Sequence, residues 1–219
     1  MLSTGRRQVK FATGRRETSY HCDMPRIEAA TVAEHHAARA AELSRLAVEI
    51  VETEGPAALT LAELARRAGL SRPSLYSYFQ SQDDLVTTIC EQAVTVWVEE
   101  VISSMEGETD PLMRLRAFVT AQLEAAAARK HDVAFALLES GMSREGQERV
   151  MAAHAPLQAA LREAVEQIGL DPAATVVPMV QAVVSSAYGQ IRAGADADLV
   201  TQGARRFVEG GLGALTDPG

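Results

Sequence analysis

The sequence predicts an all-α fold in two parts: an N-terminal three-helix unit that contains a helix-turn-helix, and a larger helical C-terminal domain. Apolar residues recur at spacings of three and four along most of the 219 residues, which is the period of one face of an α-helix. These stretches begin at Ser, Thr or Asp and end at Gly or Pro, the usual signals for helix starts and stops. We therefore expect a basic tail over 1–30, the helix-turn-helix domain over 31–82 and the C-terminal domain over 83–219.

Residues 1–30 carry six basic and three acidic residues and show no helical apolar period. We interpret them as a disordered leader, with Met24 as an alternative translation start, or as a basic arm that contacts DNA beside a bound helix. Possible metal ligands are His21 and Cys22 in this segment and the adjacent His35 and His36 that follow it. Because neighbouring residues on a helix point about 100° apart, two adjacent histidines bind one ion poorly, and no metal site is predicted.

A helix from about Val32 to Glu52 should support the helix-turn-helix. It ends before Gly55 and Pro56, a strong stop signal. The apolar stripe on one of its faces is formed by Leu43, Leu46, Ala47, Ile50 and Val51.

The next helix begins at Thr60 and ends near Ala68. Thr60 and Glu63 have the spacing of a capping box, in which the hydroxyl and the carboxylate each accept a hydrogen bond from a free backbone N–H. Gly69 follows, and glycine readily adopts the left-handed conformation that ends a helix.

Two further helix starts follow within a few residues. Ser71 can cap a short second helix that runs to about Phe79, with Leu75 and Phe79 facing inward. Ser81, with Asp84 three residues later, opens a third helix. Two short helices joined by a glycine-containing turn form a helix-turn-helix, whose second helix enters the major groove of DNA.

The second of these helices is rich in groups that bind nucleic acid. Arg72 can grip a guanine edge with two hydrogen bonds, and hydroxyl groups suit phosphate oxygens or bases. The residues expected to contact DNA are Thr60, Ser71, Arg72, Pro73, Ser74, Tyr76, Ser77, Tyr78 and Gln82.

The stretch LTLAELARRAGLSRPSLYSYFQSQDDL resembles the N-terminal domain of the TetR/AcrR family of bacterial transcription regulators. The resemblance rests on the helix that begins at Thr60, the A-x-x-x-G-L-S turn, the LYSYF sequence and the Asp84-Leu85 pair after it. It is clear over about residues 33–90. Members often carry a phosphate-binding Lys where this chain has Gln82. Glutamine donates a hydrogen bond but releases no counterion, so we expect a weaker dependence of DNA binding on salt.

The C-terminal part is expected to consist of helices. The helix opened by Ser81 should run for about 24 residues, or about 36 Å. Further helices follow from Leu112, from His131 and from Ser143, and Pro156 should kink or split the last of these.

The last two helices admit two interpretations. The penultimate helix, capped by Asp171 and Pro172, is apolar nearly all round, and the last begins at Asp196 or Asp198. They form either the core of a monomer or the interface of a homodimer, and the family resemblance favours the homodimer. Neither is long and apolar enough to span a membrane.

The resemblance also implies an apolar pocket for a small-molecule effector in the C-terminal domain. The residues expected to line it are Trp97, Phe118, His131, Phe135, His154, Met179 and Tyr188, although for each one alone core packing is a better explanation than ligand contact. The acidic C-terminal domain would suit a cationic or a neutral apolar ligand. No motif for catalysis is present, and neither an enzymatic activity nor a cofactor is predicted.

Charge and cysteine content fit a DNA-binding protein of the cytoplasm. The net charge is −8, but residues 1–80 carry a net charge of +2 and residues 81–219 one of −10. Only two cysteines occur, so a disulfide scaffold is not expected.

The sequence thus predicts a homodimeric regulator that binds a double-stranded, palindromic DNA operator and is released from it by an unknown small molecule. The alternative is an all-α small-molecule binding protein or enzyme that keeps the helix-turn-helix only as structure.

Overall fold

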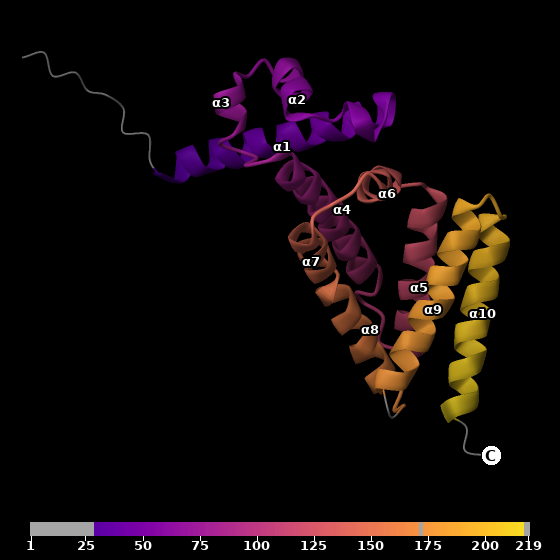
Figure 1. Cartoon of the computed structure of the whole chain (residues 1–219). Coiled ribbons are helices and arrows are strands. Elements are labelled where there is room, and N and C mark those ends of the chain that lie inside the picture. Colours follow the sequence, from indigo (N-terminus) through magenta and orange to yellow (C-terminus); the bar gives the residue numbers. More distant parts are fainter. Residues whose placement is uncertain (1–28, 171–172, 217–219) are drawn as a thin grey trace, which may run out of the picture. The chain divides into compact units, whose positions relative to one another are not determined.

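The computed structural model describes residues 29–170 and 173–216, which form helices and loops without a strand (Figure 1). The helices are α1 (Ala29–Glu54), α2 (Leu61–Arg67), α3 (Arg72–Leu75), α4 (Gln82–Ser104), α5 (Pro111–Ala127), α6 (Asp132–Glu139), α7 (Arg144–Ala153), α8 (Ala155–Gln167), α9 (Ala173–Arg192) and α10 (Ala197–Thr216), with one turn of 3-10 helix, η1 (Pro56–Ala58). The predicted all-α fold is confirmed.

Two compact units divide the chain between Ala37 and Ala38, inside α1, and the contacts given below lie within the second unit. Most of the predicted tail, with Met24, His21 and Cys22, lies outside the described residues, as does the predicted cap at Asp171 and Pro172. The first helix begins at Ala29, a few residues earlier than its apolar period indicates.

The predicted helix caps are formed by side chains. The hydroxyl oxygens of Thr60, Ser71 and Ser81 each accept a hydrogen bond from the backbone N–H three residues later, at 3.0–3.2 Å. Asp196 begins the last helix in the same way, by accepting from the Leu199 N–H at 2.9 Å. These caps define where α2, α3, α4 and α10 start, because each satisfies a donor that the helix itself leaves unpaired.

The capping box at Thr60 is only half formed. The Glu63 carboxylate accepts hydrogen bonds from Arg66 at 2.5 and 2.8 Å and from Arg67 at 2.7 Å, rather than turning back to the helix start. These two arginines hold the pKa of Glu63 at about 2, so the carboxylate stays ionised. The predicted second half of the box is therefore wrong, because charge-assisted bonds to arginine outcompete a bond to a neutral N–H.

The second helix of the helix-turn-helix is shorter than predicted and ends at Leu75 instead of Phe79. Beyond it the N–H groups of Ser77 and Tyr78 bond to carbonyls three residues back, and the Ser77 hydroxyl donates to the Ser74 carbonyl at 2.7 Å. Serine side chains that compete for backbone carbonyls in this way weaken a helix. Pro156 splits its predicted helix into α7 and α8, as expected.

A buried cluster of apolar side chains holds the elements together. Leu43, Ala47 and Ile50 of α1 are at most 1% exposed and join the same cluster as Leu64 of α2 and Leu75 of α3. Burying a side chain of this size stabilises the fold by about 1.5–3 kcal/mol. The helix-turn-helix is thus supported by α1, as the sequence predicts.

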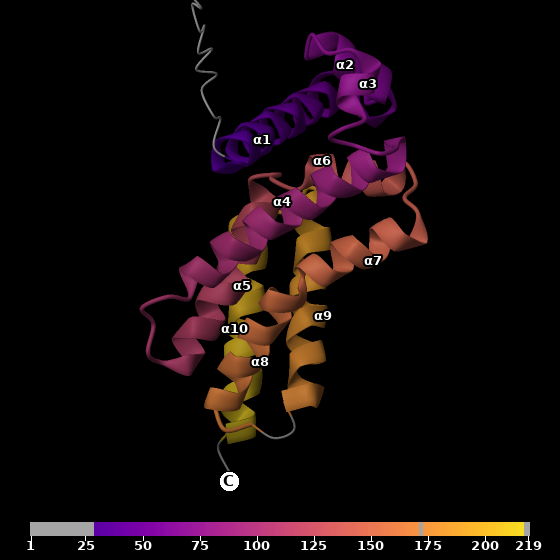
Figure 2. The same cartoon turned by 90° about the vertical axis from the view of Figure 1, so that its left-hand side faces the viewer.

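The helices of the second half pack against one another along their lengths. Helices α9 and α10 lie side by side and both contact α5, while α4 contacts α5 and α7 (Figures 1 and 2). This arrangement brings α4, α5, α6, α7, α8 and α9 around one internal pocket.

Candidate functional site

The turn between α2 and α3 fixes the exposed helix in place. Gly69 has a φ of 64°, a conformation that glycine adopts without strain, and the Leu70 N–H then bonds back to the Ala65 carbonyl at 2.9 Å. Arg39 of α1 donates to the Ala68 carbonyl at 2.9 Å, so a side chain from a third helix closes the end of α2. Leu75 anchors α3 from below, at 1% exposure.

The outer face of α3 is polar and open to solvent. The predicted residues Thr60, Ser71, Arg72, Pro73, Ser74, Tyr76 and Ser77 are exposed, and Tyr78 is half-buried. Arg72 and Tyr76 line a shallow hollow between α2 and α3 together with Thr60. The structure therefore brings the predicted DNA-contacting residues onto one surface.

Among the arginines of α2 and α3, Arg72 differs from the other two. Arg66 and Arg67 are paired with Glu63, and Arg67 also with Glu54. Arg72 forms no ion pair within the part of the chain that the structure describes. Its guanidinium is free to bind a phosphate or a guanine, and no neighbouring carboxylate has to be displaced first.

Gln82 has a role that the sequence did not reveal. Its side-chain oxygen accepts from the Leu61 N–H at 3.0 Å, and its side-chain nitrogen donates to the Leu59 carbonyl at 2.6 Å. Both ends of the amide are therefore used inside the protein, where they join the start of α4 to the start of α2. The amide nitrogen carries a second N–H that can still donate to a phosphate, so the predicted DNA contact of Gln82 stays a prediction beside its positioning of the helix-turn-helix.

A pocket of about 520 Å³ lies within the C-terminal helices. It is lined by Val94, Trp97, Phe118, Gln122, His131, Ala134, Phe135, Leu138, Gln147, Val150, Met151, His154, Leu157, Gln158, Gln181, Val184, Ser185 and Tyr188. Six of the seven predicted pocket residues are in this set. The seventh, Met179, was placed wrongly, since its side chain is 59% exposed and the residue does not line the pocket.

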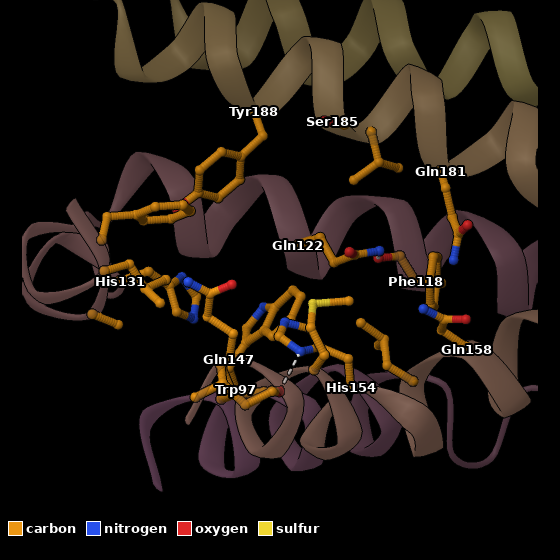
Figure 3. A pocket seen from close by; sticks show the side chains of 18 residues that line it. Trp97, Phe118, Gln122, His131, Gln147, His154, Gln158, Gln181, Ser185 and Tyr188 are labelled. Carbon is orange, nitrogen blue, oxygen red and sulfur yellow. Dashed lines mark hydrogen bonds between the residues drawn. The ribbon is translucent and has the colours of Figure 1, made fainter. Parts of the chain in front are cut away.

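Aromatic rings surround the centre of the pocket (Figure 3). The ring of Trp97 meets His131 edge-on at 5.0 Å between centroids, and His154 at 5.7 Å. Tyr188 lies 6.4 Å from the His131 ring and 5.5 Å from that of Phe135. Edge-to-face contacts of this kind hold the rings in defined orientations, so the pocket wall is preorganised.

The pocket is electrically neutral. Among the described residues that line it, none is Asp, Glu, Lys or Arg. His131 is 7% exposed, and burial lowers the pKa of its imidazole below the ordinary value of 6.5, which favours the uncharged ring. Burial likewise raises the pKa of the Tyr188 hydroxyl. The acidity of the C-terminal domain is therefore confined to its surface and gives no reason to expect a cationic ligand.

Four glutamines of the wall were missed by sequence reasoning. Gln122 is 6% exposed, and Gln147, Gln158 and Gln181 line other parts of the pocket. The only sequence signal was Gln181, a polar residue that interrupts an otherwise apolar helix. The others stand among polar and apolar neighbours alike, and only the packing of helices distant in the sequence reveals their orientation.

A polar clasp joins α7, which lines the pocket, to the N-terminal half of α4. Asp83 accepts from the Ser143 N–H at 2.8 Å and from its hydroxyl at 2.6 Å, which lowers the pKa of the Asp83 carboxyl. Arg149 donates to Asp84 at 3.1 Å and to Glu91 at 2.6 Å. Because α4 begins at Gln82, this clasp joins α7 to the same helix that the Gln82 bridge ties to the helix-turn-helix.

One face of α9 and α10 is apolar and open in the single chain. Met179 is 59% exposed, Leu199 69%, Phe207 70% and Leu215 61%. On α10 the three apolar residues are spaced by eight, so each is rotated about 80° from the one before, and together they spread over about half of the helix circumference. Although α9 is apolar nearly all round, many of its residues are exposed within one protomer.

These features define a class of protein: a helix-turn-helix protein with an exposed reading helix and an all-helical second domain around a pocket. Residues 43–89 match a family described as "Bacterial regulatory proteins, tetR family". The match covers the second half of α1, the helix-turn-helix and the start of α4, so this part of the chain is similar to the DNA-binding part of that family.

Two curated relatives match longer stretches of the chain. The chain is 25% identical to the nucleoid occlusion factor SlmA of Haemophilus influenzae over 144 residues, which are 65% of this chain and 57% of that protein. It is 35% identical to the HTH-type transcriptional activator FasR of Mycolicibacterium smegmatis over 83 residues, 38% of each. The chain thus spans about half the length of the curated relatives it matches.

Solved structures share the fold over most of the chain. The transcriptional regulator FadR of Bacillus subtilis, solved in complex with stearoyl-CoA, has a TM-score of 0.64 and 12% identity. The similarity covers 78% of this chain and 98% of that one, so it includes the C-terminal helices. No helix within the described residues is long and apolar enough to cross a membrane. The same residues contain no cluster of three or more His, Cys, Asp or Glu side chains placed for a metal ion.

Proposed function

We propose that the protein is a homodimeric, ligand-responsive transcriptional repressor that binds a palindromic DNA operator. The observation that carries this proposal is the exposed face of α3, where Arg72 forms no ion pair with a described residue. Ser71 caps the start of α3, and the Gln82 bridge ties the preceding helix α2 to α4. A helix held in this way presents its first residues to the edges of bases in the major groove.

Dimerisation would follow from the open face of α9 and α10. Two copies that pair these faces would bury Met179, Leu199, Phe207 and Leu215, all of which are exposed in one protomer. A two-fold dimer presents two reading helices, which matches an operator with two half-sites about one helical turn apart. This interface corresponds to the last two helices, where the sequence also places it.

The pocket is the proposed effector site. Its volume of about 520 Å³ is that of a drug-sized ligand, and helix α7 contributes Gln147, Val150 and Met151 to its wall. A ligand that shifts α7 would move Ser143 and Arg149, and their bonds to Asp83, Asp84 and Glu91 would transmit the shift to α4 and so tilt the reading helix. Release from DNA requires that the ligand favour the non-binding state, and a difference of about 1–3 kcal/mol is enough for a useful response.

The test is operator binding by variants of the exposed face. Arg72→Ala and Tyr76→Ala should each weaken binding, because both side chains are exposed and unneeded for the core. Loss of one good base contact corresponds to about 1–3 kcal/mol, or roughly 5- to 150-fold in affinity. Thermal unfolding should stay within about 0.5 kcal/mol of the parent, as for other surface substitutions.

A matched control is Arg45→Ala, an exposed arginine on α1 outside the reading helix. Unchanged operator affinity in both α3 variants would refute the role of this helix. Catalytic turnover, or tight ligand binding without affinity for DNA at low salt, would favour the alternative of an enzyme or binding protein.

A further inference from the structure

The pocket contains hydrogen-bonding groups but no charges. The Trp97 indole nitrogen is buried and has no hydrogen-bond partner among the described residues. Gln122 donates from its side-chain nitrogen to the Phe118 carbonyl at 3.3 Å. Buried polar groups are normally satisfied, so the unpaired indole nitrogen indicates where a polar group of a ligand would bind.

The polar groups are spread along the pocket and alternate with aromatic surface. Gln158 and Gln181, from α8 and α9, lie at one end, and His131 and Tyr188 lie at the other, with Trp97 between them (Figure 3). The glutamine amides at one end offer both donors and acceptors, and so do the Tyr188 hydroxyl and the neutral His131 ring at the other. Each end can therefore bind either kind of ligand group. The aromatic and aliphatic side chains between them suit an apolar body.

A charged ligand group would be poorly accommodated in this pocket. Moving an ion out of water is unfavourable unless an opposite charge or several strong hydrogen bonds receive it, and the wall supplies no opposite charge. Arg192 does not line the pocket, and its guanidinium carbon stacks 4.3 Å from the centre of the Phe135 ring. Its nitrogen is 3.9 Å from the Asp132 carboxylate, which also pairs with Arg129 at 2.5 Å.

From this wall we infer that the effector is an uncharged molecule with an apolar body and separate amide, carbonyl or hydroxyl groups. One acceptor of the ligand takes the hydrogen of the Trp97 indole N–H, and the glutamines bind the remaining polar groups. This inference rests on the proposed function, in that it takes the pocket to be the effector site.

The experiment uses the intrinsic fluorescence of Trp97, the single tryptophan of the sequence, to report on the pocket directly. The purified full-length protein is titrated with decanamide, decanoate and decylammonium, which share a chain length and differ in charge. Decanamide should change the emission in a saturable way and bind at least about tenfold more tightly than either ion. Equal or tighter binding of decanoate or decylammonium, or no binding of any of the three, would overturn the inference.

Variants of the wall give an independent measure by calorimetry. Gln158→Arg, at an exposed position that tolerates change, should bring decanoate binding up to or above that of decanamide, whereas Gln80→Arg outside the pocket should change neither. Trp97→Phe should weaken decanamide binding because the indole donor is lost. If Gln158→Arg leaves the preference unchanged, the pocket does not select by charge and the inference fails.

None of these measurements depends on DNA. Saturable decanamide binding by a protein that fails to recognise any operator would refute the proposed regulator and leave the ligand class standing. Specific operator binding combined with a preference for decanoate would support the proposed regulator and refute the inferred ligand class.

Discussion

Replacing Gln82 with Ala should lower both the stability of the free protein and its affinity for the operator. The substitution removes the bond to the Leu61 N–H at 3.0 Å and the bond to the Leu59 carbonyl at 2.6 Å. A hydrogen bond contributes about 0.5–1.5 kcal/mol net, and water can partly replace these two at the protein surface, so we expect a loss of about 1–2 kcal/mol. For a chain of this size that corresponds to a fall of about 2–8 °C in melting temperature.

The effect on DNA binding follows from the same energy. Without the bridge the start of α2 is no longer tied to α4, and the bound arrangement has to be ordered during association. A cost of about 1–2 kcal/mol would weaken binding by roughly 5- to 30-fold. Melting is followed by circular dichroism, and operator affinity by fluorescence anisotropy at several salt concentrations.

Gln80→Ala is the matched control, since Gln80 is exposed and its side chain makes none of these bonds. It should melt and bind as the parent does. If Gln82→Ala had parental stability but weakened operator binding, the bridging role would be refuted. The result would instead support a direct contact between Gln82 and a DNA phosphate. The weaker salt dependence that the missing lysine suggests stays a prediction, and the same titrations measure it.

Two further predictions concern the C-terminal domain. Phe207→Glu, on the open face of α10, should convert the dimer to monomers, because burial of each Phe207 contributes about 1.5–3 kcal/mol. Analytical ultracentrifugation measures the oligomeric state. Gln202→Glu, in the hollow between α5 and α10, should stay dimeric, and a dimeric Phe207→Glu would place the interface elsewhere. His131→Gln should reduce the loss of stability at acidic pH. The pKa of His131 is lower in the folded than in the unfolded protein, so the unfolded chain binds the extra proton first. The free energy of unfolding therefore falls as the pH drops below about 6.5, by at most about 1.4 kcal/mol per pH unit. Urea denaturation between about pH 7 and pH 5 measures this slope, and equal slopes for both proteins would contradict the assignment.

The sequence was most informative where structure depends on neighbouring residues. The caps at Thr60, Ser71 and Ser81 were predictable because a hydroxyl and an N–H three residues later are always close at a helix start. The split at Pro156 was predictable for the same reason, since proline removes a donor from its own helix.

Contacts between distant segments were out of reach of the sequence. Gln82 bonds to residues more than 20 positions away in the sequence. Glu63 is a different case: its partners are close in the sequence, but several compete for its carboxylate, and only packing selects one set. Met179 and Gln181 stand two positions apart on one helix, yet only Gln181 lines the pocket. An apolar helix does not show which of its faces meets the pocket, the core or a second protomer.

The most direct test of the central claim is selection of bound sequences from a pool of random duplex DNA by the purified full-length protein. The account predicts enrichment of an inverted repeat with half-sites about one helical turn apart, and loss of the enrichment in Arg72→Ala. An unenriched pool, bound weakly and released as salt rises, would show only nonspecific electrostatic attraction and would contradict a sequence-specific regulator.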